Sequence, residues 1–261
     1  MDYKNDLIKV DILENRIAIV TLNNPPMNLN SIASMAELAE DFRLLRRDPD
    51  VGVVILTGAG TKAFNVGTDL HEMADMYGLY KEKKFYNEML MMDNIEFFPK
   101  PTICAIEGYC MGGGLELAMC CDFRIASETA KFSQPEITLG VYPGAGGLSR
   151  LPRIVGMGKA LEMMYTGISI DAEDAYRYRL VNHVVPSGET VNKALEIAKR
   201  IAGFSPEALA AIKEGSRRMW QKESKDNFYT NLDYVEPIFE SPNAQEGIQA
   251  FLEKRPANFK F

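Results

Sequence analysis

The first part of the chain alternates apolar runs with turn residues, which predicts strands and helices in succession. Residues 7–22 alternate and then run apolar, with a break at Asn15 and Arg16, as is typical of a β-hairpin. Residues 31–47 carry apolar side chains at helical spacing and stop at an Asp-Pro-Asp turn. The β-branched run at 51–57 predicts a strand that is buried on both faces.

The same alternation continues through the middle of the chain. A helix rich in Tyr, Lys and Met is expected around 80–92, and a buried strand at 102–107. A glycine-rich turn at 111–114 leads into a short helix from Leu115, and another strand is expected around 123–126. Strands that alternate with helices predict an α/β fold.

The pattern becomes mainly helical from Gly158 onward. One short strand is expected at 180–185, and Ser205-Pro206 opens a helix that runs to Trp220. The last sixty or so residues show no strand signal. We therefore expect an α/β core at residues 1–200 and a helical C-terminal region at 201–261.

Composition and charge narrow the classes of function. A chain that is 46% hydrophobic and 25% charged has the make-up of an ordinary globular protein. Its net charge of -7 is spread along the chain and offers no basic field, so nucleic acid is not an expected partner. No apolar run approaches the roughly 20 residues of a membrane span, and the first residues resemble no signal or transit peptide. A cytoplasmic protein is expected.

The four cysteines fit neither a paired zinc site nor a dense disulfide framework. Cys104, Cys110, Cys120 and Cys121 sit among apolar residues, so we expect reduced core residues. A reactive thiol is the less favoured alternative.

The first of three glycine-rich segments is a weak candidate for a cofactor site. Gly58–Ala63 matches the G-x-G-x-x-A dinucleotide fingerprint and follows a predicted strand. The next residues continue as a loop or short extended chain, without the helix that would receive a pyrophosphate. A tight surface turn is the better interpretation, and NAD is a minor alternative.

The second segment, at 63–73, contains Gly67 just before a helix expected to begin near Asp69. A helix start presents unpaired N–H groups, and a turn glycine lets another group approach them closely. For this segment alone, the favoured interpretation is that Asp69 simply caps the helix.

The third segment, at 107–116, places three consecutive glycines between a buried strand and an apolar helix. Free N–H groups at this helix start could hold a carbonyl oxygen that becomes negative during a reaction. Glu116 falls in the first turn among apolar neighbours, which should raise its pKa toward neutrality. Glu136 follows Pro135 and precedes a second glycine-rich loop. Both glutamates could equally be ordinary helix-start residues, and the residues alone leave this open.

Four segments together carry a resemblance to a known family. Residues 62–70, 100–127, 130–156 and 245–259 resemble the crotonase or enoyl-CoA hydratase-isomerase superfamily, over essentially the whole chain. The resemblance implies a spiral of ββα units with a helical C-terminal trimerisation region. It also implies a homotrimer or a homohexamer made of two trimers.

The resemblance implies a role for each candidate residue. The N–H groups of Thr68 and Gly113 would form an oxyanion hole for a thioester carbonyl, and Glu116 and Glu136 would flank the reacting carbons, as in the two-glutamate hydratases. Lys254 would lie near the coenzyme phosphates across a subunit boundary. The residues expected to contact the coenzyme A (CoA) ester are Ala63, Asn65, Val66, Asp69, Leu70, Gly112, Pro135, Gly144 and Lys254.

The expected activity is that of an enoyl-CoA hydratase or 3-hydroxyacyl-CoA dehydratase acting on an acyl-CoA thioester. Neither a metal nor a redox cofactor is expected, because CoA enters as part of the substrate and the two histidines form no ligand cluster. The alternatives are a double-bond isomerase, or a lyase or hydrolase of the same superfamily. A non-catalytic oligomeric scaffold or RNA-binding protein is a further alternative, which the acidic balance disfavours.

Two departures from the usual family pattern concern the substrate. Residues 27–30 replace a common Asn-Ala-Leu motif, and Asn65-Val66 replace a pair of small residues. A weaker hypothesis is that the helix around 80–92 and the residues before it line a pocket for a bulky or cyclic acyl group. Its candidates are Met73, Tyr77, Tyr80 and Phe85. An apolar helix face packed on the core is the alternative for most of them.

Overall fold

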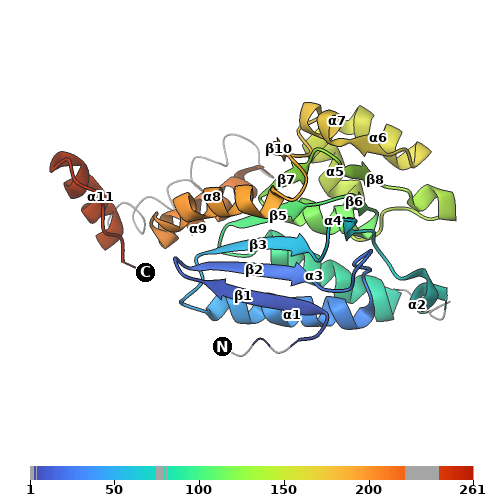
Figure 1. Ribbon diagram of the computed structural model, residues 1–261, viewed down its shortest axis with the longest axis horizontal. Coiled ribbons are helices and arrows are strands. Elements are labelled where there is room, and N and C mark those ends of the chain that lie inside the picture. The colour runs from blue at the N-terminus through green and yellow to red at the C-terminus, as the bar shows by residue number, and fades with distance from the viewer. Residues whose placement is uncertain (1–2, 4, 75–78, 80, 221–240, 261) are drawn as a thin grey trace.

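The computed structural model describes residues 3, 5–74, 79, 81–220 and 241–260. A six-stranded sheet forms its centre, in the order β1-β2-β3-β5-β7-β10 (Figure 1). The strands β1 and β2 pair antiparallel as a hairpin, and the remaining pairs are parallel. The strands are β1 (Ile8–Leu13), β2 (Ile17–Leu22), β3 (Val53–Gly58), β5 (Thr102–Ile106), β7 (Phe123–Ser127) and β10 (His183–Val185).

A second, four-stranded sheet has the order β4-β6-β8-β9. Its strands are β4 (Ala63–Asn65), β6 (Tyr109–Met111), β8 (Lys131–Ser133) and β9 (Ile170–Asp171). The first three are parallel to one another, and β9 pairs antiparallel to β8. The hydrophobic pattern did not predict this sheet.

Helices cover both faces of the six-stranded sheet. In Figure 1, α1 and α3 run side by side along one face, and α8 packs on β2, β3, β5 and β7 from the other. The helical elements are α1 (Ile32–Arg47), α2 (Leu70–Ala74), η1 (Lys81–Phe85), α3 (Tyr86–Glu96), α4 (Gly113–Cys120), η2 (Glu136–Leu139), α5 (Gly147–Val155), α6 (Met157–Thr166), α7 (Ala172–Arg177), α8 (Thr190–Ala202), α9 (Pro206–Trp220) and α11 (Pro242–Leu252).

The chain passes repeatedly from one sheet to the other and then into a helix. β3, β5 and β7 belong to the six-stranded sheet, and each is followed by a strand of the four-stranded sheet, namely β4, β6 and β8. A helical element follows each of these three pairs. This threefold ββα repeat confirms the predicted α/β class and the spiral of ββα units.

The buried strands are apolar on both sides, as their sequence predicts. In β3, Val54 and Leu56 pack into the core on the α1 side of the sheet, whereas Val53 and Ile55 pack into the core on the α8 side. All four side chains are fully buried. Because both faces are covered, the strand needs a continuous apolar run rather than an alternating one.

The structure confirms several local predictions and corrects two. The hairpin at 7–22 is confirmed, and α1 begins where expected, with Ser31 Oγ accepting from Ser34 N–H at 3.0 Å. The four cysteines are buried and free, as expected. The G-x-G-x-x-A segment leads into β4 rather than a helix, so the turn interpretation is confirmed. Two bounds were wrong: α4 begins at Gly113, not Leu115, and the strand expected at 180–185 spans only His183–Val185.

The C-terminal region is helical in the part that the structure describes. α11 lies beside α9, where Asn243 Nδ2 donates to Glu207 Oε2 at 2.9 Å. In Figure 1, α11 projects at the opposite end of the molecule from α6 and α7. The division at residue 200 stays a prediction. None of the described helices is both long enough and apolar enough to cross a bilayer.

Candidate active site

Three loops of the candidate site follow three neighbouring strands. β4, β6 and β8 are adjacent and parallel, so their carboxyl ends meet at one edge of the four-stranded sheet. Thr68, Gly113 and Glu136 each lie two or three residues beyond the end of one of these strands. The topology therefore brings three predicted site residues to the same edge.

The loop after β4 lies against the start of α4. A Cβ placed on Gly67 would be 2.9 Å from Gly113 N, so a larger residue would separate the two loops. Asn30 brackets Thr68: its N–H donates to the Gly67 carbonyl at 2.8 Å, and its carbonyl accepts from Asp69 N–H at 3.1 Å. No described residue accepts a hydrogen bond from the N–H of Thr68 or of Gly113. Two free donors are thus held close together, as an oxyanion hole requires.

A glycine with unusual backbone angles sets the direction of the second donor. Gly112 caps α4 with φ 54° and ψ -129°, a conformation that a side chain would strain. Its N–H donates to the Ser133 carbonyl at 3.0 Å, which ties the turn to the end of β8. Gly113 is then the first residue of α4, where the helix dipole adds partial positive charge.

The Glu116 carboxyl is buried in the first turn of α4. Only 3% of this residue is exposed, and its Oε1 accepts from the N–H groups of Ala145 at 2.9 Å and Gly147 at 2.7 Å. Burial raises the pKa of Glu116 to about 8. The two N–H groups lower this pKa, whereas the charges of Glu136 and Glu88 raise it further. The expected shift toward neutrality is confirmed.

The Glu136 carboxyl lies on the other side of the glycine turn. A Cβ placed on Gly112 would be 3.2 Å from Glu136 Oε1. The Gln134 amide nitrogen, turned toward this carboxylate, lies 2.8 and 3.1 Å from its two oxygens. Burial raises the pKa of Glu136 to about 7. Near neutral pH the two carboxyls can therefore share one proton between them.

These groups can stabilise an oxyanion and move protons beside it. The unpaired N–H groups of Thr68 and Gly113 belong to adjoining loops, Glu136 lies against Gly112, and Glu116 lies in the helical turn that Gly113 begins. Carboxyls with pKa values near the working pH are effective general acids and bases. Within the described residues, no group of three or more His, Cys, Asp or Glu side chains is placed to hold a metal ion.

The other predicted contact residues divide into two sets. Val66, Asp69, Leu70, Pro135 and Gly144 are partly or fully exposed around these loops, and Gly112 is buried in the turn. Ala63 and Asn65 are only 0% and 1% exposed, so their side chains lie beneath the loop and not in its opening. For these two side chains, contact with a substrate is not supported by the structure. The reason is that β4 turns them toward the core.

The predicted acyl-pocket residues are described only in part. Phe85 packs against the loop after Glu136, since a Cβ placed on Gly144 would be 2.7 Å from Phe85 Cε1. Met73 is half-buried in α2. Tyr77 and Tyr80 lie outside the described residues. A role in binding an acyl group stays a prediction for all four.

Lys254 does not reach the candidate site within one chain. It follows α11, which Figure 1 shows at the far end of the molecule from α4. Its backbone has φ 54°, in a turn that ends the helix. The expected role of Lys254 across a subunit boundary stays a prediction.

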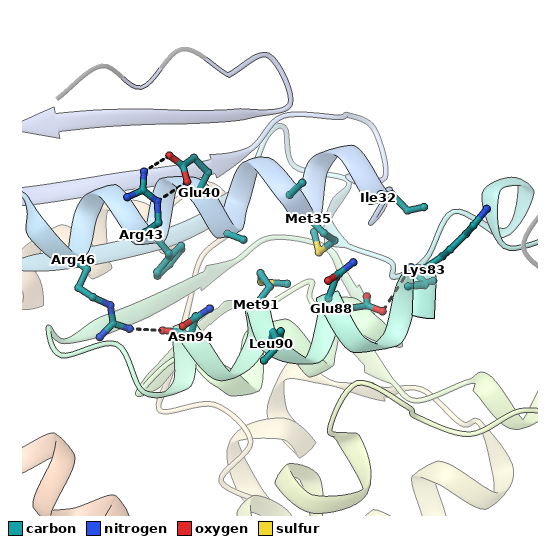
Figure 2. Close-up of a pocket in the computed structure, with 15 residues that line it drawn as sticks. Ile32, Met35, Glu40, Arg43, Arg46, Lys83, Glu88, Leu90, Met91 and Asn94 are labelled. Atoms are coloured by element: carbon teal, nitrogen blue, oxygen red, sulfur yellow. Dashed lines mark hydrogen bonds and ion pairs between the residues drawn. The ribbon is translucent and has the colours of Figure 1, made fainter. Parts of the chain in front are cut away.

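A pocket of about 550 Å³ lies between α1 and α3 (Figure 2). Its lining includes the apolar residues Ile32, Met35 and Met91, together with Glu88 and Lys84. Figure 2 also shows Arg43 bonded to Glu40. Neither Glu116 nor Glu136 lines this pocket. It is therefore separate from the candidate site at the ends of β4, β6 and β8.

One contribution to the site was missed in the sequence. The N–H groups of Ala145 and Gly147 hold Glu116, although only Gly144 was selected from that loop. The signal was present, because the loop was recognised as a place of close backbone approach. Glu88, which is buried near Gly113, was not selected either.

The fold and this constellation of groups define a crotonase-type protein. The sequence pattern of the enoyl-CoA hydratase/isomerase family matches residues 13–261, so the chain belongs to this family. Its substrate class is therefore an acyl-CoA thioester.

Individual relatives agree over almost the full length. The chain is 36% identical to a crotonyl-CoA hydratase of Syntrophomonas wolfei over 260 residues, which cover 99% of both chains. It is 38% identical to a short-chain-enoyl-CoA hydratase of Clostridium acetobutylicum over 244 residues, covering 93% of each. It superposes on the crystal structure of an enoyl-CoA hydratase from Bacillus anthracis with a TM-score of 0.94 and 38% identity, covering 98% of this chain and 99% of that one.

Proposed function

We propose that the chain catalyses the reversible addition of water across the double bond next to a CoA thioester. The observation that carries this proposal is a pair of carboxyls near the start of α4: Glu116 is buried in its first turn, and the half-buried Glu136 lies against Gly112. Water chemistry needs one group to take a proton and another to give one. The hydratases among its relatives support this choice over the isomerase alternative.

The proposed reaction begins with the thioester carbonyl between the N–H groups of Thr68 and Gly113. These donors stabilise the negative charge that develops on oxygen, by about 3 kcal/mol for a typical oxyanion-hole donor. The ionised carboxyl of the pair deprotonates a water molecule as the water attacks C3. The protonated carboxyl supplies the proton to C2. The two carboxyls titrate as a coupled pair, and dehydration follows the same path in reverse.

A panel of CoA esters tests this function and its nearest alternative. Purified protein should hydrate crotonyl-CoA and dehydrate 3-hydroxybutyryl-CoA, both followed by absorbance of the conjugated enoyl thioester. Glu136→Gln should lose about 100-fold to 10,000-fold in kcat, because one of the two proton-transfer groups is gone. Glu128→Gln is a matched control, since Glu128 is exposed beyond β7.

Two outcomes of this experiment would contradict the proposal. One is that Glu136→Gln keeps wild-type hydration. The other is that the wild type moves the double bond of a 3-enoyl-CoA but adds no water, which would favour an isomerase.

The acyl group is a further part of the proposal. The Phe85 ring closes on the loop that holds Glu116, and we infer that it forms one wall of a site for a bulky or cyclic acyl group. The ratio of kcat/KM for a cyclic enoyl-CoA to that for crotonyl-CoA measures this preference. A clear preference of the wild type for the short linear chain would rule it out.

We also propose that the protein works without a metal or redox cofactor, in the cytoplasm, as a homotrimer or homohexamer. Residues 201–261 would then complete the CoA site of a neighbouring subunit, with Lys254 near its phosphates. The reach of α11 away from the core supports this arrangement. Light scattering should give the mass of a trimer or hexamer, and Lys254→Ala should raise KM for CoA esters. A monomer with full activity would contradict it.

A further inference from the structure

Asn65 is buried beneath the Thr68 loop with its whole amide engaged. The residue is 1% exposed, and its Oδ1 accepts from Gly67 N–H at 2.7 Å. Its Nδ2 donates to Asn30 Oδ1 at 2.6 Å and to the Asn28 carbonyl. One side chain thus links the Gly67 N–H, one residue before Thr68, to the segment of Asn28 and Asn30.

Asn30 connects this first donor loop to the second. Its backbone bonds to Gly67 and Asp69, on either side of Thr68. Its side-chain nitrogen points toward the other donor, since a Cβ placed on Gly113 would be 3.1 Å from Asn30 Nδ2. Asn30 is 0% exposed. It therefore contacts both loops that supply the N–H groups of the oxyanion hole.

Glu88 on α3 completes the arrangement behind Gly113. It is 3% exposed, its Oε2 lies 3.6 Å from the equally buried Lys84 Nζ, and its Oε1 would be 3.7 Å from a Cβ on Gly113. Burial raises the pKa of Glu88, whereas the charge of Lys84 lowers it. Among the described residues, neither Glu88 Oε1 nor Asn30 Nδ2 makes a hydrogen bond. Two polar atoms are thus left beside the same glycine.

Such a buried polar group is costly for stability alone. Each buried amide and each buried ion loses its hydration, and an apolar cluster of the same volume is often equally stable or more stable. Both Glu88 and Lys84 also line the pocket of Figure 2, so the ion pair does not simply fill the core. The polar side chains are concentrated where the two donor loops meet.

We propose that Asn30, Asn65 and Glu88 are positioning residues that hold the Thr68 and Gly113 N–H groups at the spacing the thioester oxygen needs. This inference rests on the proposed function, because it concerns the same site. A donor that moves by a fraction of an ångström loses much of its stabilisation of a developing charge, while ground-state binding through the rest of CoA is kept. The effect should appear in kcat and not in KM.

Three variants test the proposal by steady-state kinetics with crotonyl-CoA. Asn65→Ala, Asn30→Leu and Glu88→Ala should each lower kcat by about 10-fold to 100-fold with KM within about 3-fold. Glu88→Gln keeps an oxygen toward Asn30 and should retain more kcat than Glu88→Ala. Should Asn65→Ala fail to fold, Asn65→Ser keeps an acceptor for Gly67 and replaces it.

Thr190→Val is the matched control. The Thr190 hydroxyl is buried and donates to Glu107 Oε1 at 2.8 Å, so its loss removes one buried hydrogen bond at the start of α8, outside the donor loops. Thr190→Val should lower thermal stability as Asn65→Ala does, with kcat unchanged. An equal loss of kcat in Thr190→Val would make the effect a general loss of structure and would overturn the proposal.

A second readout does not depend on turnover. Butyryl-CoA has no double bond and cannot react, yet infrared difference spectra report how strongly its thioester carbonyl is polarised in the site. The carbonyl band should shift to lower frequency on binding to wild type and Thr190→Val, and by half as much or less in Asn65→Ala and Asn30→Leu. Equal shifts in all four proteins, or no shift in the wild type, would overturn the inference. A wild-type shift without hydratase activity would contradict the proposed function and leave the inference standing.

Discussion

In the six-stranded sheet, β5 has five residues and all of them are buried. The strands of the four-stranded sheet are shorter, with two or three residues each. The larger sheet has a continuous apolar core on both faces and carries none of the candidate catalytic groups. The smaller sheet joins the core through Phe64, Cys110, Phe132 and Ile170, and Thr68, Gly113 and Glu136 follow the ends of its strands. Both sheets therefore contribute to the core, but only the loops after the smaller sheet place candidate catalytic groups.

The first prediction concerns a cavity that a substitution creates in the larger sheet. Ile55 is fully buried in β3 and packs on the α8 side. Ile55→Ala should lower the free energy of unfolding by about 2–5 kcal/mol through lost burial and the cavity it leaves. Denaturant titration measures this, and kcat of the folded enzyme should stay within about 2-fold.

A control in the same sheet is Ile12→Ala, because Ile12 is 38% exposed on β1. This change should cost about 0.5 kcal/mol or less. A large loss of kcat in folded Ile55→Ala would contradict the separation of the two sheets.

The second prediction concerns the turn after the smaller sheet. Gly112→Ala places a side chain at φ 54° and puts a Cβ 3.2 Å from Glu136 Oε1, so the carboxyl must move. A displacement of this kind should lower kcat by about 100-fold. The strain itself should cost only about 1–2 kcal/mol of stability.

Gly188→Ala separates strain from displacement. Gly188 also has positive φ, of 86°, and a Cβ there would meet nothing within 4 Å. It should lose similar stability while activity is kept. If both variants lose activity equally, the displacement of Glu136 is not the cause of the lost activity in Gly112→Ala.

The third prediction is a bell-shaped pH dependence. Burial raises the pKa of Glu136 to about 7 and that of Glu116 to about 8, so the singly protonated pair dominates between these values. kcat/KM should be highest between about pH 7 and 8 and should fall about 10-fold per pH unit well outside this window. Rates with crotonyl-CoA across the range test this, and a flat profile from about pH 6 to 9 would contradict it.

The smallest expected effect is that Glu116→Gln gains stability at high pH although it loses activity. Because the pKa of folded Glu116 is raised from 4.5 to about 8, the folded state binds more protons than the unfolded state between these values, and stability falls as pH rises through this range. Glu116→Gln carries no charge and avoids this fall. Its melting temperature should match the wild type near about pH 5 and exceed it by several degrees near about pH 9. A variant that is less stable at the higher pH would show that ionised Glu116 is not a cost to folding.

The sequence predicted the larger sheet better than the smaller one. The runs at 51–57 and 102–107 are long and apolar, so β3 and β5 were found nearly in full. The three-residue strands β4, β6 and β8 are too short to show alternation, and glycines border β6 at both ends. The site residues were found from the glycine turns and the family resemblance instead.

The sequence pattern did not single out Glu88, for a different reason. Glu88 and Lys84 have the i, i+4 spacing of an ordinary surface ion pair. Glu88 shares the buried face of α3 with Met91, Met92 and Ile95, which is the signal that could have placed it inside. Asn65 was assigned to the substrate opening, because its direction depends on β4, a strand that the pattern could not show.

The central claim is that the two carboxyls beside the donor loops move water to and from C3 of a CoA ester. The direct measurement is exchange of ¹⁸O from labelled water into 3-hydroxybutyryl-CoA, followed by mass spectrometry. Wild type should incorporate the label at the C3 hydroxyl, and Glu116→Gln and Glu136→Gln should slow this by about 100-fold or more. Label found only in a released carboxylate, or no label at C3, would contradict the account.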